Sequence, residues 1–128
     1  MRGLLDTHAM IWLIEGDSRL SADAANAIRD PSAVLWFSIA SYWEMCLKIG
    51  KGKLTLHPDW RQTLAREMHL NRIVWLGIQP VHCDIVTSLP HLHGNPFDRM
   101  LVAQAQREGL TIITVDGMMG DYGVSVLW

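Results

Sequence analysis

The chain has 128 residues and a net charge of −2; 49% of its residues are hydrophobic and 19% are charged. This composition excludes a disordered chain and predicts one globular domain spanning residues 1–128. No apolar run approaches the roughly 18 residues of a membrane span, so we expect no membrane association and a cytoplasmic location. Cys46 and Cys83 form neither a metal-type pair nor a disulfide framework, and we predict that both are buried thiols in a reducing compartment.

The negative net charge excludes a simple basic nucleic-acid-binding protein. This exclusion is weaker if several of the acidic residues lie together in one site, because the rest of the surface is then less negative. Setting aside four of the 13 acidic residues changes the net charge from −2 to +2, which leaves a mildly basic remaining surface. The six tryptophans are also more than a core alone requires, and tryptophan is enriched in partner interfaces.

Strand and helix patterns alternate along the chain. Short apolar runs predict strands at residues 3–5, 34–37, 73–76, 111–115 and 124–128. Amphipathic spacing, capping residues and Gly or Pro stops predict helices at residues 8–15, 21–29, 39–49, 59–70, 80–89 and 96–108. Alternation with fully apolar strands predicts a three-layer α/β/α sandwich around a mostly parallel sheet.

The helix expected from His8 to Glu15 is apolar almost all round, which is too wide for one helix face. Two interpretations stay open for this helix. It is either buried on two sides within the chain, or it contacts another subunit or a partner.

The last predicted long helix begins with a clear capping signal. Asn95 is a typical cap, and Pro96 stands at the first helical position, where its missing N–H is harmless. Asp98 falls in the first turn, where the helix dipole favours a carboxylate.

Four acids stand out by their positions. Asp6 and Asp116 follow predicted strands directly, and sites in α/β folds form at the carboxyl ends of strands. Glu44 lies among apolar neighbours in the helix at 39–49, and buried carboxylates need partners. If these acids and Asp98 meet, their repulsion demands a cation, and oxygen ligands without Cys or a His cluster suit Mg²⁺ or Mn²⁺. Such a site is typical of phosphodiester hydrolysis.

Each acid also has a purely structural explanation. Asp6 can cap the following helix, and Asp98 can simply complement the helix dipole. Glu44 can pair with Lys48 one turn later, and Asp116 can form an Asx turn before a glycine.

The chain as a whole resembles PIN-domain proteins of the VapC-like toxin type, found in bacterial toxin–antitoxin pairs. The matching segments are Leu4-Leu5-Asp6-Thr7-His8 with Trp12, residues 38–44 with Lys48 and Gly52-Lys53-Leu54, residues 96–105, Thr114-Val115-Asp116, and the ending from Tyr122 to Trp128. They occur in the family's order along the whole chain.

This resemblance implies a Mg²⁺- or Mn²⁺-dependent ribonuclease in which metal-activated water attacks an RNA phosphodiester. It implies that Asp6, Glu44, Asp98 and Asp116 form the metal-binding quartet, with Asp6 and Asp98 as direct ligands and Thr114 as a supporting hydroxyl. It also implies an antitoxin protein as partner. Together with the apolar helix and the tryptophan excess, it implies a homodimer.

One position departs from the family. Close relatives read Asp-Pro-Phe-Asp-Arg, whereas this chain has Asn95 in the first place. Asn keeps the helix cap and removes one charge. We expect metal binding to survive, with affinity or rate reduced if the missing carboxylate normally helps. The alternative function is therefore a catalytically weakened PIN-fold module that binds RNA or protein.

Basic groups flank the proposed acids, and they are candidates for holding RNA phosphates. These are Lys48, Lys51, Lys53 and Arg99, with His93 as a residue that anchors the loop or lies near the RNA. His91 and His93 resemble an H-x-H ligand pair, but no cysteine accompanies them and we do not favour zinc. Aspartate phosphotransfer chemistry is a rival class, disfavoured because His8 stands where a second Asp is needed and no Lys follows Asp116.

Overall fold

The computed structural model describes all 128 residues and contains a five-stranded sheet in which every pair of neighbours is parallel. The strands are β1 (Arg2–Leu5), β2 (Val34–Ser38), β3 (Ile73–Leu76), β4 (Thr111–Ile113) and β5 (Val126–Leu127), in the order β3-β2-β1-β4-β5. The helices are α1 (Thr7–Glu15), α2 (Ala22–Arg29), α3 (Ile39–Gly50), α4 (Trp60–Leu70), α5 (Pro80–Ser88), α6 (Pro96–Glu108) and a 3₁₀ helix, η1 (Gly117–Tyr122). None of these helices has the length and apolar character needed to cross a membrane.

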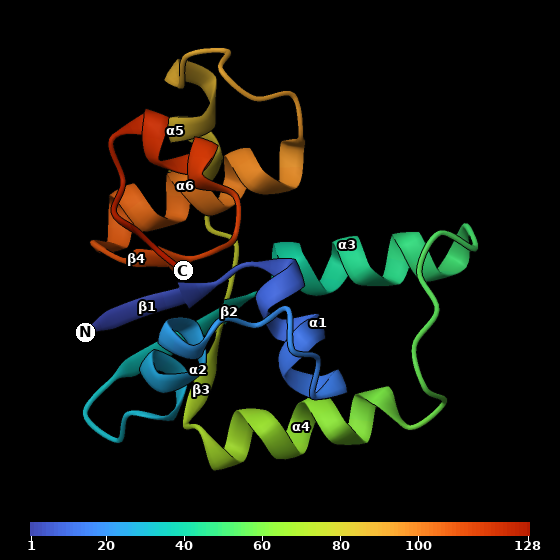
Figure 1. The fold of residues 1–128 in the computed structure, drawn as a ribbon. Coiled ribbons are helices and arrows are strands. Elements are labelled where there is room, and N and C mark those ends of the chain that lie inside the picture. The colour runs from blue at the N-terminus through green and yellow to red at the C-terminus, as the bar shows by residue number, and fades with distance from the viewer.

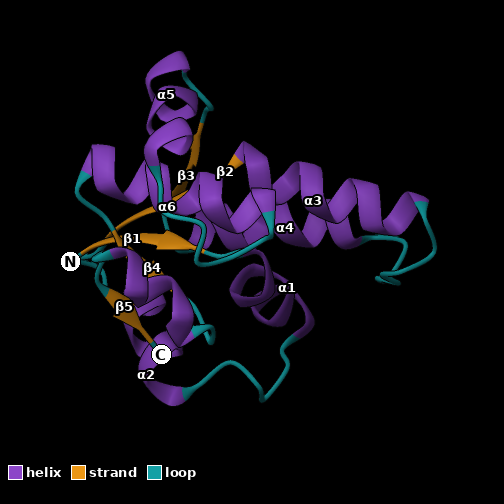
Figure 2. Ribbon diagram, turned by 90° about the horizontal axis from the view of Figure 1, so that it is seen from above, coloured by secondary structure: helices purple, strands orange, loops and turns teal.

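Helices cover both faces of the sheet, which confirms the predicted α/β/α sandwich (Figures 1 and 2). In Figure 1, α5 and α6 lie above the sheet, and α1, α2 and α4 lie below it. Successive residues of β1 point to opposite faces of the sheet. Leu4 packs into the core under α6, and Leu5 packs into the core formed with α1, α2 and α4. Both side chains are fully buried, and this explains why the central strand β1 is apolar on both faces instead of alternating.

The helix predicted from His8 is α1, and its apolar surface is used within the chain. Ala9, Met10, Ile11, Trp12 and Leu13 are all buried and belong to the larger core cluster. The first of the two interpretations, burial on two sides, is therefore correct. The second interpretation, a contact of α1 with another subunit or a partner, stays a prediction.

Several predicted boundaries shift near the C-terminus. The strand predicted at 111–115 ends at Ile113, the strand predicted at 124–128 is confined to Val126–Leu127, and the glycine-bearing loop between them holds η1. Cys46 is half-buried and Cys83 is exposed, so the prediction of two buried thiols is wrong for Cys83.

The strand order fixes where a ligand site can form. The chain builds outward from β1 to β2 and β3, and then returns to the other side of β1 with β4 and β5. The order reverses between β1 and β4, and the crevice beyond the carboxyl ends of strands at such a reversal is the usual ligand site of open parallel sheets. Asp6 leaves the sheet directly after β1, and Thr114 directly after β4.

Candidate metal centre

A cavity of about 270 Å³ lies at this reversal, and all four singled-out acids line it. Asp6 follows β1, Glu44 stands in the second turn of α3, Asp98 in the first turn of α6, and Asp116 before η1. The remaining lining residues are Thr7, His8, Lys48, Asn95, Val115 and Met119. Tertiary folding thus brings carboxylates from four separate elements to one place.

Asp6 is almost completely buried and holds two hydrogen bonds. Its Oδ1 accepts from the backbone N–H of Ala9 at 2.8 Å, which makes it the cap of α1. Its Oδ2 accepts from the hydroxyl of Thr114 at 2.5 Å. Burial raises the pKa of this carboxyl, and the hydrogen bonds from Thr114 and Ala9 oppose the rise. The capping role is real, and it leaves each oxygen a further lone pair for a cation.

Glu44 is buried with a donor at each oxygen. Thr7 donates its hydroxyl to Oε1 at 2.6 Å, and the Lys48 ammonium lies 2.9 Å from Oε2. The i,i+4 pair with Lys48 was predicted, but the contribution of Thr7 was not. The sequence does contain a signal for this contact, because Thr7 follows Asp6 directly and therefore lies at the same carboxyl edge of the sheet.

Asp98 is the most perturbed acid of the cluster. Burial and the nearby charge of Glu44 raise its pKa to about 6, with smaller increases from Asp6 and Asp116 and an opposing effect of His93. Its Oδ2 lies 3.4 Å from His93 Nε2. A carboxylate that is destabilised by neighbouring carboxylates is a group that gains from a bound cation.

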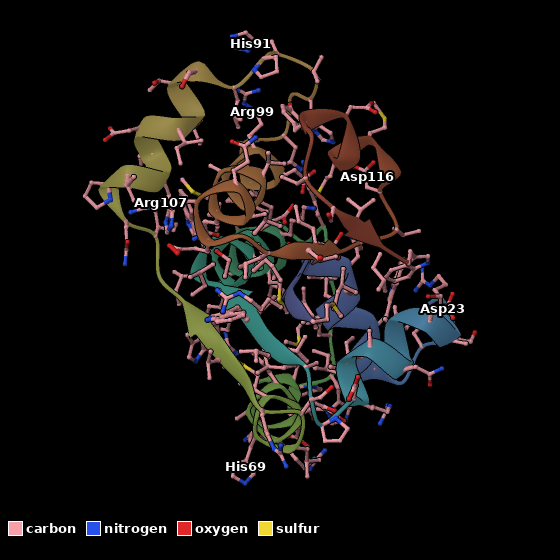
Figure 3. All side chains as sticks on the ribbon, turned by 90° about the vertical axis from the view of Figure 1, so that its left-hand side faces the viewer. Asp23, His69, His91, Arg99, Arg107 and Asp116 are labelled. Atoms are coloured by element: carbon pink, nitrogen blue, oxygen red, sulfur yellow. The ribbon has the colours of Figure 1, made fainter.

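Asp116 lines the cavity just before η1, and His93 contacts this carboxylate. Asp116 Oδ1 accepts from the N–H of Met118 at 3.0 Å, as expected of an Asx turn, and Oδ2 lies 3.1 Å from His93 Nε2. The ligand-type atoms of His93, Asp98 and Asp116 all lie within 4.8 Å of one another. His91 does not join them, since it is exposed on the outer loop, well away from Asp116 in Figure 3.

Asn95 has two separate structural roles at the mouth of α6. Its side-chain Oδ1 accepts from the N–H groups of Phe97 and Asp98, at 2.9 and 3.3 Å. Its own backbone N–H donates to His93 Nδ1 at 3.1 Å. The amide therefore performs the predicted capping without adding a charge beside Asp98.

The basic candidates lie in three different places. Lys48 lines the cavity, whereas Lys51 and Lys53 are exposed beyond it at the end of α3. Arg99 is buried in another place, near α5 (Figure 3), where its guanidinium donates to the carbonyls of Pro90, Val86 and Leu89 and to the Tyr122 hydroxyl. The prediction that Arg99 holds RNA phosphates does not fit this position, because its donors already satisfy the end of α5.

The sequence matches the model of the PIN domain over residues 3–124. The chain belongs to the PIN domain family. None of the curated protein sequences compared with it matches significantly.

Solved structures similar to this PIN domain cover nearly its whole length. VapBC2 from Rickettsia felis, bound to a promoter DNA fragment, has a TM-score of 0.72 at 13% identity over 99% of this chain and 98% of that chain. VapBC-1 from nontypeable Haemophilus influenzae has a TM-score of 0.65 at 17% identity, over 99% and 97%. A toxin–antitoxin complex from Klebsiella pneumoniae has a TM-score of 0.63 at 20% identity, over 98% and 96%. At such identities these likenesses show a shared fold.

The donor set of this PIN domain fits a hard divalent cation. Every carboxylate oxygen of the cluster is a ligand type that Mg²⁺ and Mn²⁺ prefer, and no thiolate lies among the lining residues. Burial raises the pKa of both Asp6 and Asp98, and the neighbouring charge of Glu44 adds to the rise, so a bound cation would stabilise both carboxylates in their charged form. Lys48 offsets part of that charge, from the side of Glu44 only.

Proposed function

We propose that this PIN domain is a Mg²⁺- or Mn²⁺-dependent ribonuclease and the toxin of a toxin–antitoxin pair. The observation that carries the proposal is the convergence of Asp6, Glu44, Asp98 and Asp116 in one cavity at the reversal of the strand order. PIN domains are generally nucleases, and the similar structures are toxin–antitoxin complexes. A cytoplasmic location belongs to the same proposal.

The contacts in the cavity suggest a division of roles. Asp6 and Asp98 are the proposed direct ligands, and Thr114 fixes the orientation of Asp6 through the short hydroxyl contact. Glu44, whose charge is already offset by the Lys48 ammonium at 2.9 Å, is better suited to orienting a water than to direct coordination. A divalent cation supplies an activated water and neutralises charge on the phosphate.

Lys48 is the basic residue best placed to meet RNA. Its side chain is 38% exposed while that of Glu44 is 4% exposed, so the ammonium stands between the buried acid and the solvent. An RNA phosphate entering the cavity would meet this positive charge before the carboxylates. Lys51 and Lys53 would contact the RNA further from the scissile bond.

Cleavage of RNA by the purified protein tests the function directly. We expect cleavage with Mg²⁺ or Mn²⁺ that EDTA abolishes, and loss of cleavage in Asp6→Asn and Asp98→Asn. Asp121→Asn is the matched control, because this aspartate is exposed and outside the cavity. Equal cleavage by wild type and both site variants would indicate contamination and would overturn the proposal. Metal-independent RNA binding without cleavage would favour the weakened binding module instead.

We propose two protein partners as well, an antitoxin and a second copy of this chain. The proposed antitoxin rests on the similar toxin–antitoxin structures. The second copy rests on α3, where Ile39, Trp43 and Leu47 recur at every fourth position and are 41%, 54% and 37% exposed. Trp43 also borders an apolar hollow of about 460 Å³ and packs edge-on against Phe97 at a centroid distance of 5.3 Å. Such a stripe is typical of an interface.

A further inference from the structure

His93 places a ring nitrogen against the acid cluster, and its role depends on which ring nitrogen carries the proton. The ring lies between the loop after α5 and the carboxylates, with its side chain 20% exposed. It approaches Asp116 and Asp98 closely enough to belong to a metal-binding group by distance alone. Distance does not distinguish a ligand from a hydrogen-bond donor.

The partner of Nδ1 decides between these roles. The backbone N–H of Asn95 points at Nδ1 from 3.1 Å, and a backbone N–H is only ever a donor. Nδ1 must therefore offer a lone pair. A neutral imidazole with a bare Nδ1 carries its proton on Nε2, the atom that faces Asp116 Oδ2 at 3.1 Å and Asp98 Oδ2 at 3.4 Å.

A protonated Nε2 has no lone pair for a cation. Coordination through Nε2 would require both nitrogens to be bare, or the bond to Asn95 to break. Metal-ligating histidines normally show the reverse arrangement, in which the second nitrogen donates to an acceptor. The loop geometry thus disfavours coordination by His93 and makes its Nε2–H a donor to Asp116, with Asp98 Oδ2 3.4 Å from the same nitrogen.

We propose that His93 is a positioning residue whose Nε2–H holds Asp116 in place beside Asp98 for the metal, without itself binding the metal. The inference rests on the proposed metal-dependent function. By donating to Asp116 Oδ2, with Asp98 Oδ2 3.4 Å from the same nitrogen, His93 reduces the repulsion between these carboxylates and leaves their other lone pairs free. The backbone of Asn95 is the part of the loop that fixes this arrangement, whatever side chain stands there.

The tautomer is measured without metal or RNA. A long-range ¹H–¹⁵N NMR spectrum of the imidazoles should show His93 with its proton on Nε2 and a bare Nδ1. A proton on Nδ1 of neutral His93 would overturn the proposal.

The role toward the metal is measured by Mn²⁺ titration and pulsed EPR. We expect His93→Ala to bind Mn²⁺ about tenfold or more weakly. His93→Gln, which can place an amide N–H near the position of Nε2, should recover most of that loss. His91→Ala, an exposed histidine of the same loop, should bind Mn²⁺ like wild type. The EPR spectrum of wild type should show no directly coordinated nitrogen.

A directly coordinated nitrogen that disappears in His93→Ala would show that His93 is a ligand and would overturn the proposal. Unchanged Mn²⁺ affinity in a folded His93→Ala protein would overturn it too. If wild type bound no Mn²⁺ at all, the metal-dependent function would fail, whereas the NMR spectrum would still report whether Nε2 carries the proton that faces Asp116. The two failures are therefore distinguishable.

Discussion

The Thr7 hydroxyl donates to Glu44 Oε1 at 2.6 Å, and this contact ties the first turn of α1 to the second turn of α3. Both side chains are nearly inaccessible to solvent, so water cannot replace the lost donor easily. Thr7→Val keeps the shape and leaves one oxygen of Glu44 with no protein donor. We expect the free energy of unfolding to fall by about 1–3 kcal/mol, measured by urea denaturation. Thr55→Val, at an exposed position, should change it little, and an equal effect of both variants would contradict the buried contact.

Asp98 lowers the stability of the metal-free protein at neutral pH. Its pKa is raised from 3.8 to about 6 by burial and by Glu44, so the folded state binds the proton more tightly than the unfolded state. The stability associated with this proton is complete below about pH 4 and is lost as the pH rises through 6. A shift of about two units gives an upper limit of about 3 kcal/mol. Asp98→Asn should therefore be more stable than wild type at pH 7.5, and the gain should shrink towards pH 4.

The same variant separates stability from metal binding. Mn²⁺ should raise the melting temperature of wild type and leave Asp98→Asn nearly unchanged, because a ligand stabilises only the state that binds it. Metal binding to wild type should also weaken below about pH 6, where Asp98 is protonated. Equal stabilisation of both proteins by Mn²⁺ would show that Asp98 is not a ligand.

Arg99 joins α6 to the end of α5, and its removal should affect folding more than RNA contact. Arg99→Met keeps the aliphatic stem and leaves the carbonyls of Pro90, Val86 and Leu89 without their donor. We expect a loss of about 2–4 kcal/mol, because hydrogen bonds from a charged group are stronger than neutral ones. Arg107→Met is the control, since Arg107 is exposed on the same helix (Figure 3). If Arg99→Met kept its stability and lost RNA binding, the phosphate role would be restored.

Asn95→Asp tests the position that departs from the family pattern. Aspartate can accept the same N–H bonds from Phe97 and Asp98, so the helix cap should survive with a change in stability below about 0.5 kcal/mol. The added charge near Asp98 should raise the pKa of that carboxyl further and strengthen Mn²⁺ binding, which calorimetric titration measures. Weaker Mn²⁺ binding would show that the amide improves the site.

The exposed stripe on α3 predicts the oligomeric state. We expect light scattering to give twice the 14.5 kDa mass of one chain, and Leu47→Glu to give a single-chain mass. Leu70→Glu, on the exposed end of α4, should not change the mass. A single-chain mass for wild type at high concentration would contradict the homodimer.

Elements whose signals are local were predictable from the sequence. The caps Asp6 and Asn95 lie within three residues of the N–H groups they accept, so spacing alone predicted them. The strands were predicted from their apolar runs, because a strand that is buried on both faces needs no alternation of polar and apolar residues. The end of β4 was not predictable, because Thr114 turns to an aspartate 108 positions away, and no window of neighbouring residues contains that partner.

The α/β alternation, the helix starts and the four acids could all be identified from the sequence, because Asp6 and Asp116 follow strands, Asp98 begins a helix and Glu44 stands among apolar neighbours. What those acids and their neighbours contact is set by the tertiary structure. Arg99 follows Asp98 in sequence yet points to α5, because successive side chains of a helix diverge. His93 looked like half of a ligand pair with His91, and the N–H of Asn95 makes it a donor instead. Local signals fix backbone conformation, whereas side-chain chemistry depends on partners that the fold brings from distant parts of the chain.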